Sequence, residues 1–160
     1  MDSYFLGLDC SSKGVHGVII NQQAEYKEQL KWISKLPDFE DRFIEFLKNF
    51  FDDLGIIKER FSDLRVAIEA PIYIQNPKTT MQIAAVVYIA RFICFLHGIE
   101  CVPIQNKSWK KYVLERGNAS KQDIFNFSNI FWGNVFVEQD HADAACIALW
   151  GRYNYLGEDI

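Results

Sequence analysis

The stretch GLDCSSKGVHGVII, residues 7–20, decides the fold of this chain. It predicts two apolar strands, over residues 4–9 and 14–20, that are joined by a tight Ser-Ser-Lys-Gly turn. Asp9 stands at the end of the first of these buried strands, where a charged carboxylate is costly unless something compensates it. A single acid at such a place is usually a turn residue or a helix cap. The role of Asp9 therefore depends on whether other carboxylates converge on it.

Length and composition restrict the class of protein. The chain has 160 residues, of which 49% are apolar, and this predicts one globular domain over residues 1–160. Its net charge of −4 disfavours a nonspecific coat on nucleic acid. We find no apolar run of the roughly 18 residues that a membrane helix requires, no signal-peptide pattern and no paired cysteine spacing. These features predict a cytoplasmic protein with reduced thiols and no membrane partner.

The remaining sequence predicts strands that alternate with helices. The expected strands are residues 25–33, 64–71 and 99–104. The expected helices are residues 38–55 with Gly55 as the stop, 81–98, 108–117, a segment that Ser120 and Asp123 open as a capping box, and a terminal helix from about Asp140. Residues 71–80 are expected to form a loop. This order predicts an α/β domain built on a mixed sheet.

Four acids are placed so that they could meet at one edge of this sheet. Asp9 and Glu69 each end a candidate central strand, and the carboxyl ends of parallel neighbours lie on the same edge. Asp140 and Asp143 are three residues apart and share one face of the terminal helix. Converging carboxylates repel each other unless cations neutralise them, and oxygen ligands select Mg²⁺ or Mn²⁺. Two such ions can activate a water for phosphodiester attack.

Four motifs in this order resemble the RuvC-type Holliday-junction resolvases, the crossover junction endodeoxyribonucleases. The motifs are GLDCSSKGVHGVII, VAIEAP, NKSWKKYVLERGNASKQDI and DHADAACIALWG. The resemblance covers most of the chain and implies an RNase H-like fold, with a mixed five-stranded sheet flanked by helices. It also implies a metal-dependent homodimer that cuts four-way DNA junctions by paired symmetric nicks. Cys10-Ser11 stands where bacterial members commonly have Pro-Gly, which suits a phage-encoded or divergent member.

The resemblance assigns roles residue by residue. Asp9, Glu69, Asp140 and Asp143 would be catalytic and would hold the two Mg²⁺ ions, with Mn²⁺ as a substitute. Lys110 and Lys121 would be catalytic through the phosphates that they approach. The other expected DNA contacts are the basic residues Lys107, Lys111 and Arg116, together with Ile72 and Tyr73, where the family places an aromatic wedge.

Several alternatives stay open at this stage. His141 adjoins Asp140, and because some relatives use a His at this position, either residue could reach the metal. Position favours Asp140, since His141 points about 100° away from the shared face of the two acids, and we expect His141 at the solvent or at the core edge. His16 and His97 have apolar neighbours and are interpreted as structural. The opening also resembles the phosphate loop of actin-like sugar kinases, but the chain offers no second such loop. A YqgF-like nuclease that acts on RNA, or a noncatalytic module that binds branched DNA, remains an alternative function.

The helix expected over residues 81–96 has hardly any polar stripe. A helix that is apolar all round is usually buried on every side, either in a core or against a partner. We expect this helix to form the interface of a homodimer, and a central core helix is the alternative.

Overall fold

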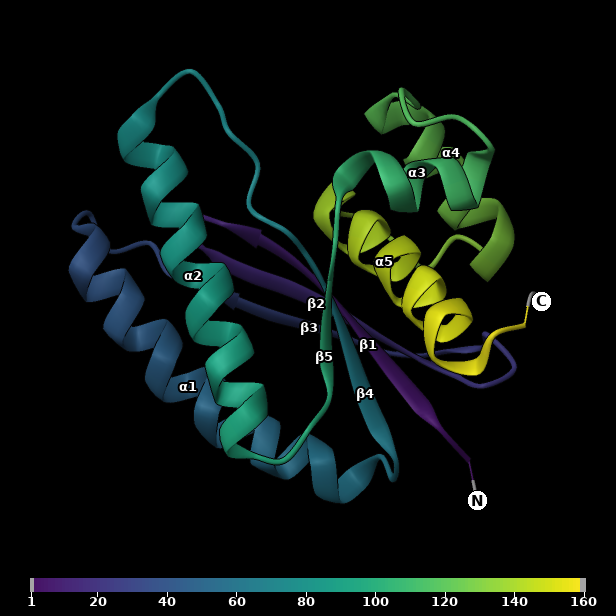
Figure 1. The fold of residues 1–160 in the computed structure, drawn as a ribbon, viewed down its shortest axis with the longest axis horizontal. Helices are drawn as coiled ribbons and strands as arrows, with labels where there is room; N and C mark the ends of the chain where they lie inside the picture. The colour runs from purple at the N-terminus through teal and green to yellow at the C-terminus, as the bar shows by residue number, and fades with distance from the viewer. Residues whose placement is uncertain (1, 159–160) are drawn as a thin grey trace.

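A five-stranded mixed sheet separates two layers of helices (Figure 1). The computed structural model describes residues 2–158. The strands are β1 (Tyr4–Ser11), β2 (Gly14–Asn21), β3 (Tyr26–Ile33), β4 (Leu64–Glu69) and β5 (Cys101–Ile104). The helices are α1 (Phe39–Arg60), α2 (Pro77–Leu96), α3 (Asn106–Leu114), α4 (Lys121–Trp132) and α5 (Gln139–Leu156). The predicted α/β fold with a mixed five-stranded sheet is confirmed.

The strand order β3-β2-β1-β4-β5 places the two acid-bearing strands side by side. β1 runs parallel to β4 with Leu8 opposite Ile68, so the next residues along, Asp9 and Glu69, lie at the same edge. β2 and β3 are antiparallel to their neighbours, and Asp9 pairs with His16 across the first hairpin. Asp9 is not the last residue of its strand, because this pairing with β2 continues to Ser11. The predicted convergence at one sheet edge is nevertheless confirmed.

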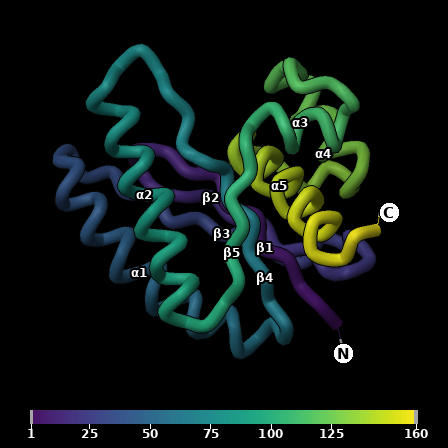
Figure 2. Tube along the Cα trace, viewed as in Figure 1, coloured from purple at the N-terminus to yellow at the C-terminus, as the bar shows by residue number. Residues whose placement is uncertain are grey.

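α1 and α2 cover one face of the sheet, and their apolar side chains form the larger core. Phe50 and Leu54 of α1 and Ala90 of α2 are fully buried there among the side chains of β1, β2 and β4. The tube in Figure 2 shows α1 and α2 side by side, with α5 on the opposite side of the sheet. This core stabilises the fold and holds β1 and β4, the strands that carry Asp9 and Glu69, in place.

Two predicted helix boundaries on this face are wrong. α1 does not stop at Gly55 but continues to Arg60, because Ile57 is buried in the core one half-turn later. A side chain at Gly55 would press on the His97 ring, whose Cε1 atom lies 3.2 Å from an added Cβ. α2 begins at Pro77, inside the expected loop, because the Asn76 side chain accepts the N–H groups of the first turn at 3.0 and 3.3 Å.

α5 covers the other face and lies unusually close to β1. A Cβ added at Gly7 would lie 2.0 Å from the Ala144 carbonyl oxygen and 2.4 Å from the Ala148 nitrogen, so only glycine permits this approach. The small buried side chains of α5 allow the same closeness. This contact brings the first two turns of α5, with Asp140 and Asp143, to the carboxyl edge of β1. The predicted start of this helix is confirmed, as is the capping box of Ser120 and Asp123 on α4.

Among residues 2–158, one helix is long and apolar enough to cross a membrane, and it is α2, with a mean hydropathy of 1.7. The expectation that no segment would have this length and composition is therefore wrong. The property is weak support for a membrane role, because core helices of soluble proteins share it. Five residues of α2 are buried in the core, whereas Phe92 and Phe95 are exposed.

Candidate active site

Three of the four predicted acids form a compact group at the carboxyl edge of the sheet. Asp9, Asp140 and Asp143 each offer a carboxylate oxygen, and these oxygens all lie within 4.8 Å of one another. β1 supplies Asp9, the first turn of α5 supplies Asp140, and the second turn supplies Asp143. An all-oxygen set of this kind fits Mg²⁺ or Mn²⁺ and suits neither a thiolate-bound metal nor a haem.

The electrostatics of this group favour a bound cation. Burial raises the pKa of Asp9 well above its usual range, and the nearby carboxylates of Glu69, Asp143 and Asp140 raise it further. Burial likewise raises the pKa of Asp143 to about 6, although a hydrogen bond of 3.0 Å from the Gln139 amide opposes the shift. Like charges in a partly dehydrated site disfavour ionisation. A divalent cation would remove this repulsion, which supports the metal-site prediction.

Glu69, the fourth predicted acid, lies beside this group but not within it. Its charge is close enough to raise the pKa of both Asp9 and Asp143. Its Oε2 atom accepts a hydrogen bond of 2.6 Å from the Trp109 indole N–H and another of 3.0 Å from the Asn106 amide. The structure therefore brings all four acids to one edge, and α3 holds one oxygen of Glu69.

A histidine that the sequence did not assign to the site lies next to Asp140. His16, interpreted from the sequence as structural, is buried, with Nε2 at 2.8 Å from a Glu138 carboxylate oxygen and Nδ1 at 3.7 Å from an Asp140 oxygen. The signal was the tight hairpin, since a turn at residues 12 and 13 pairs residue 9 with residue 16. Lys31 also contacts Glu138, at 2.6 Å. His16 and Glu138 thus extend the polar surroundings of the acids.

His141 is buried, and of the two predicted places only the core edge fits. Its ring contacts the His16 ring edge-on, with centroids 4.8 Å apart, and Nε2 lies 2.9 Å from the Leu30 carbonyl oxygen. Burial lowers the pKa of His141, which favours a neutral imidazole donating to that carbonyl. His97, the third histidine, is the C-cap residue of α2 and contacts the Phe51 carbonyl oxygen of α1 at 2.8 Å.

The basic segment, residues 107–121, lies on the same side of the sheet as α5 (Figure 1). Lys110 lies near enough to Asp143 for its charge to lower the pKa of that acid, and its Nζ atom is 5.7 Å from the centroid of a Trp109 ring. Lys107, Lys111 and Lys121 are exposed, and Arg116 forms an ion pair of 2.8 Å with Asp123. Positive charge thus lies next to the acidic edge, which disposes this surface toward a polyanion.

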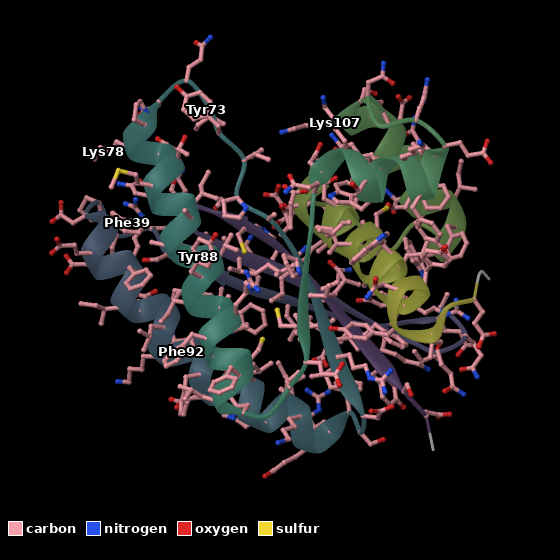
Figure 3. The ribbon with its side chains drawn as sticks, in the orientation of Figure 1. Phe39, Tyr73, Lys78, Tyr88, Phe92 and Lys107 are labelled. Atoms are coloured by element: carbon pink, nitrogen blue, oxygen red, sulfur yellow. The ribbon has the colours of Figure 1, made fainter. Side chains whose placement is uncertain are left out.

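Ile72 and Tyr73 lie in the loop between β4 and α2. Tyr73 is 78% exposed and Ile72 is 40% exposed, so both present apolar surface to the solvent. Figure 3 shows Tyr73 and Lys107 at the same end of the molecule, on opposite sides of the sheet's carboxyl edge. The two elements that the sequence assigned to DNA therefore flank the acids.

Comparison with known proteins gives one sequence relative and several structural ones. No family model matches the chain. It is 27% identical over 103 residues to a crossover junction endodeoxyribonuclease RuvC of Brachyspira hyodysenteriae, and the match covers 64% of each chain. The chain thus spans a little under two thirds of the length of this curated relative.

Solved structures match over nearly the whole chain. The structure of T. thermophilus RuvC in complex with a Holliday junction substrate has a TM-score of 0.78 at 14% identity, with 97% of this chain and 96% of that chain covered. A second Thermus thermophilus RuvC structure has a TM-score of 0.73 at 15% identity, covering 96% of each. A yeast mitochondrial Holliday junction resolvase follows at 0.60 and 15%, covering 96% of this chain and 79% of that one. The chain has the RuvC fold, and the resemblance to RuvC-type resolvases is confirmed.

Proposed function

We propose that this chain, with its RuvC fold, is a metal-dependent, structure-selective endonuclease that resolves four-way DNA junctions by paired nicks. The observation that carries the proposal is the group of Asp9, Asp140 and Asp143 at the carboxyl edge of the sheet, with Glu69 beside it. The comparisons support the fold on which these acids are arranged.

The four acids would hold two Mg²⁺ ions, for which Mn²⁺ would substitute. Their oxygens match the preference of these ions, and the repulsion among Asp9, Asp143 and their neighbours would favour binding. When bound, the ions supply positive charge that activates a water and stabilises the leaving oxygen. The chain's own carboxylates hold and orient these charges, and partial burial of the site limits access of bulk water.

The basic segment and the β4–α2 loop would bind the branched DNA. Lys110, whose charge lowers the pKa of Asp143, would meet a phosphate near the acids. Lys121, at the start of α4, would meet a neighbouring one. The remaining proposed DNA contacts are Lys107, Lys111, Arg116, Ile72 and Tyr73. Cations that contact phosphates position the duplex without reading its sequence, and an exposed Tyr73 beside Ile72 would enter the open centre of a junction.

A homodimer would place two such sites on opposite strands of one junction. α2 supports this proposal, because Tyr88, Phe92 and Phe95 expose more than half of their surface and line one surface hollow. Figure 3 shows Tyr88 and Phe92 on this helix. Exposed aromatic side chains that lie together mark an interaction surface more often than a free one. A two-fold interface would match the symmetry of a four-way junction. Such an enzyme would work in the cytoplasm, where its DNA substrate lies.

Cleavage of a labelled four-way junction tests this proposal. We expect paired nicks near the branch point with Mg²⁺ or Mn²⁺, no cleavage with chelator, and far slower cleavage of linear duplex and of structured RNA. Preferred cleavage of RNA would instead favour a YqgF-like nuclease, and junction binding without cleavage would favour a noncatalytic module.

The Asp9→Asn variant removes a charge from the acidic group while keeping its shape. We expect cleavage to fall at least about a hundredfold, because an ordered ion contributes several kcal/mol to such a reaction. Junction binding should persist in a gel-shift assay. The matched control is Asp52→Asn on the exposed surface of α1, which should cleave normally. Normal cleavage by Asp9→Asn at saturating Mg²⁺ would contradict the site.

A further inference from the structure

Two hydrogen bonds from α3 to Glu69 have no role in the function proposed so far. The Trp109 indole and the Asn106 amide both donate to the same carboxylate oxygen, Oε2, at 2.6 and 3.0 Å. The second oxygen, Oε1, receives neither of these bonds. Glu69 thus has one oxygen, Oε2, bound by α3, while Oε1 takes no part in these two bonds.

Trp109 can hold this carboxylate in place because its own side chain is packed in the core. It is fully buried in a core cluster with Ile104, Ile124 and Ile147, which come from β5, α4 and α5. An indole has a single N–H donor, and in a buried place that donor needs an acceptor. The bond to Glu69 satisfies this donor. A shift of the carboxylate would leave the buried N–H without its acceptor, and this cost keeps the carboxylate in position.

The same helix carries the proposed phosphate contacts. Lys110 follows Trp109 directly, and Lys107 follows Asn106. α3 therefore joins the acid on β4 to the basic surface through adjacent residues. A displacement of α3 would move the engaged oxygen of Glu69 and the lysines together.

We propose that Trp109 and Asn106 are positioning residues that fix Glu69 so that it offers one oxygen, Oε1, to a divalent ion. The inference rests on the proposed function, since it assigns Glu69 to that metal site. Hydrogen bonds of this kind orient ligands in metal centres, and their loss typically weakens metal affinity by about 10–100-fold. Trp109 has the shorter bond and the rigid side chain, so its contribution exceeds that of Asn106.

The test measures Mn²⁺ binding to the metal-free protein by titration calorimetry, a readout that does not require cleavage. The Trp109→Phe variant keeps an aromatic ring in the core and removes the donor. We expect its Mn²⁺ affinity to fall about tenfold or more, while binding of a four-way junction in chelator stays unchanged. Asn106→Leu is a second variant in case Trp109→Phe does not fold, and it should show a smaller loss.

Trp32→Phe is the matched control. The Trp32 indole also donates to a carboxylate, that of Asp53 at 2.9 Å, and its ring is buried on the other face of the sheet. This variant should bind Mn²⁺ like the wild type, with thermal unfolding recorded for each variant. Unchanged Mn²⁺ affinity in folded Trp109→Phe and Asn106→Leu, or an equal loss in Trp32→Phe, would overturn the inference alone. A wild-type protein that binds no Mn²⁺ would overturn the proposed function, and the inference with it.

Discussion

α2 and α5 lie on opposite faces of the same sheet, and their sequences and burial do not correspond. α2 is the more apolar helix, yet only five of its 20 residues are buried. α5 contains His141, two acids and Arg152, yet ten of its 18 residues are buried. The helix that hydropathy would place in the core is partly exposed, and the helix with charged residues lies closest to the central strand.

Side-chain size explains this difference better than hydropathy. Ala144 and Ala148 on α5 face Gly7 on β1, and the resulting backbone approach buries α5 over most of its length. α2 carries large apolar side chains on the side away from the sheet as well, and a sheet covers only one side of a helix. Tyr88 and Phe92 therefore remain outside the monomer's core. The close packing of α5 holds its two acids in place, whereas the exposed apolar side of α2 is suited to contact with another protein surface.

The largest effect should come from breaking the close contact of α5. In Gly7→Ala, the new methyl group would overlap backbone atoms of Ala144 and Ala148, which cannot move aside like a flexible side chain. We expect the free energy of unfolding to fall by about 3 kcal/mol. We also expect cleavage activity to be lost, because Asp143 moves with the helix. Urea unfolding measures the first quantity. A variant of wild-type stability would show that α5 is not closely packed.

The acidic end of α5 should make stability depend on pH in the opposite sense to an ordinary ion pair. With its pKa raised to about 6, folded Asp143 holds its proton more tightly than the unfolded chain does. In metal-free protein its contribution to stability is therefore present at about pH 4 and is lost as the pH rises through 6.

The variant Asp143→Asn removes this contribution, together with the part of the Asp9 shift that the Asp143 charge causes. The variant should gain about 1–2 kcal/mol on the wild type between pH 4 and 7, after allowance for partial solvent screening. Thermal or urea unfolding in chelator at each pH measures the difference. Added Mg²⁺ should reduce it, because an ion favours the ionised acid. A difference that does not vary with pH would contradict the raised pKa.

A charged residue introduced on the exposed side of α2 should prevent dimer formation and leave the fold intact. Phe95 is 75% exposed, and Phe95→Arg should change the free energy of unfolding by no more than about 0.5 kcal/mol. Sedimentation should show the wild type at twice 18.6 kDa and the variant at 18.6 kDa. Ile130→Arg on α4, where Ile130 is 84% exposed, is the matched control and should remain dimeric. A wild type that stays monomeric with and without junction DNA would remove α2 as an interface.

The smallest expected effect is a change in the salt dependence of DNA binding when single lysines on either side of the sheet are removed. Lys121→Ala, at the start of α4, should flatten the log–log salt dependence of junction binding by about one unit. Lys110→Ala should do the same and also slow cleavage at saturating DNA. Lys48→Ala on α1, beneath the other face, should leave the slope unchanged. Equal slopes for all three variants and the wild type would remove the basic segment from the interface.

The sequence by itself determined the elements and which acids could meet. Apolar strand runs, helical periodicity and the cap at Ser120 are local signals, and each appears in the structure. Parallel pairing of β1 with β4 then requires Asp9 and Glu69 to share an edge. Local signals were insufficient at Gly55, where they predicted the end of a helix. The glycine makes room for the ring of His97, the residue that follows α2.

Only the tertiary structure decided how these acids are held. That the Trp109 indole donates to Glu69 depends on where α3 lies against β4, and residues 40 apart in sequence give no periodic signal of contact. His16 beside Asp140 likewise joins a hairpin to a helix that is more than a hundred residues away. Sequence patterns report the conformation of neighbouring residues. Contacts between distant segments depend on how their surfaces fit, which is a property of the whole core.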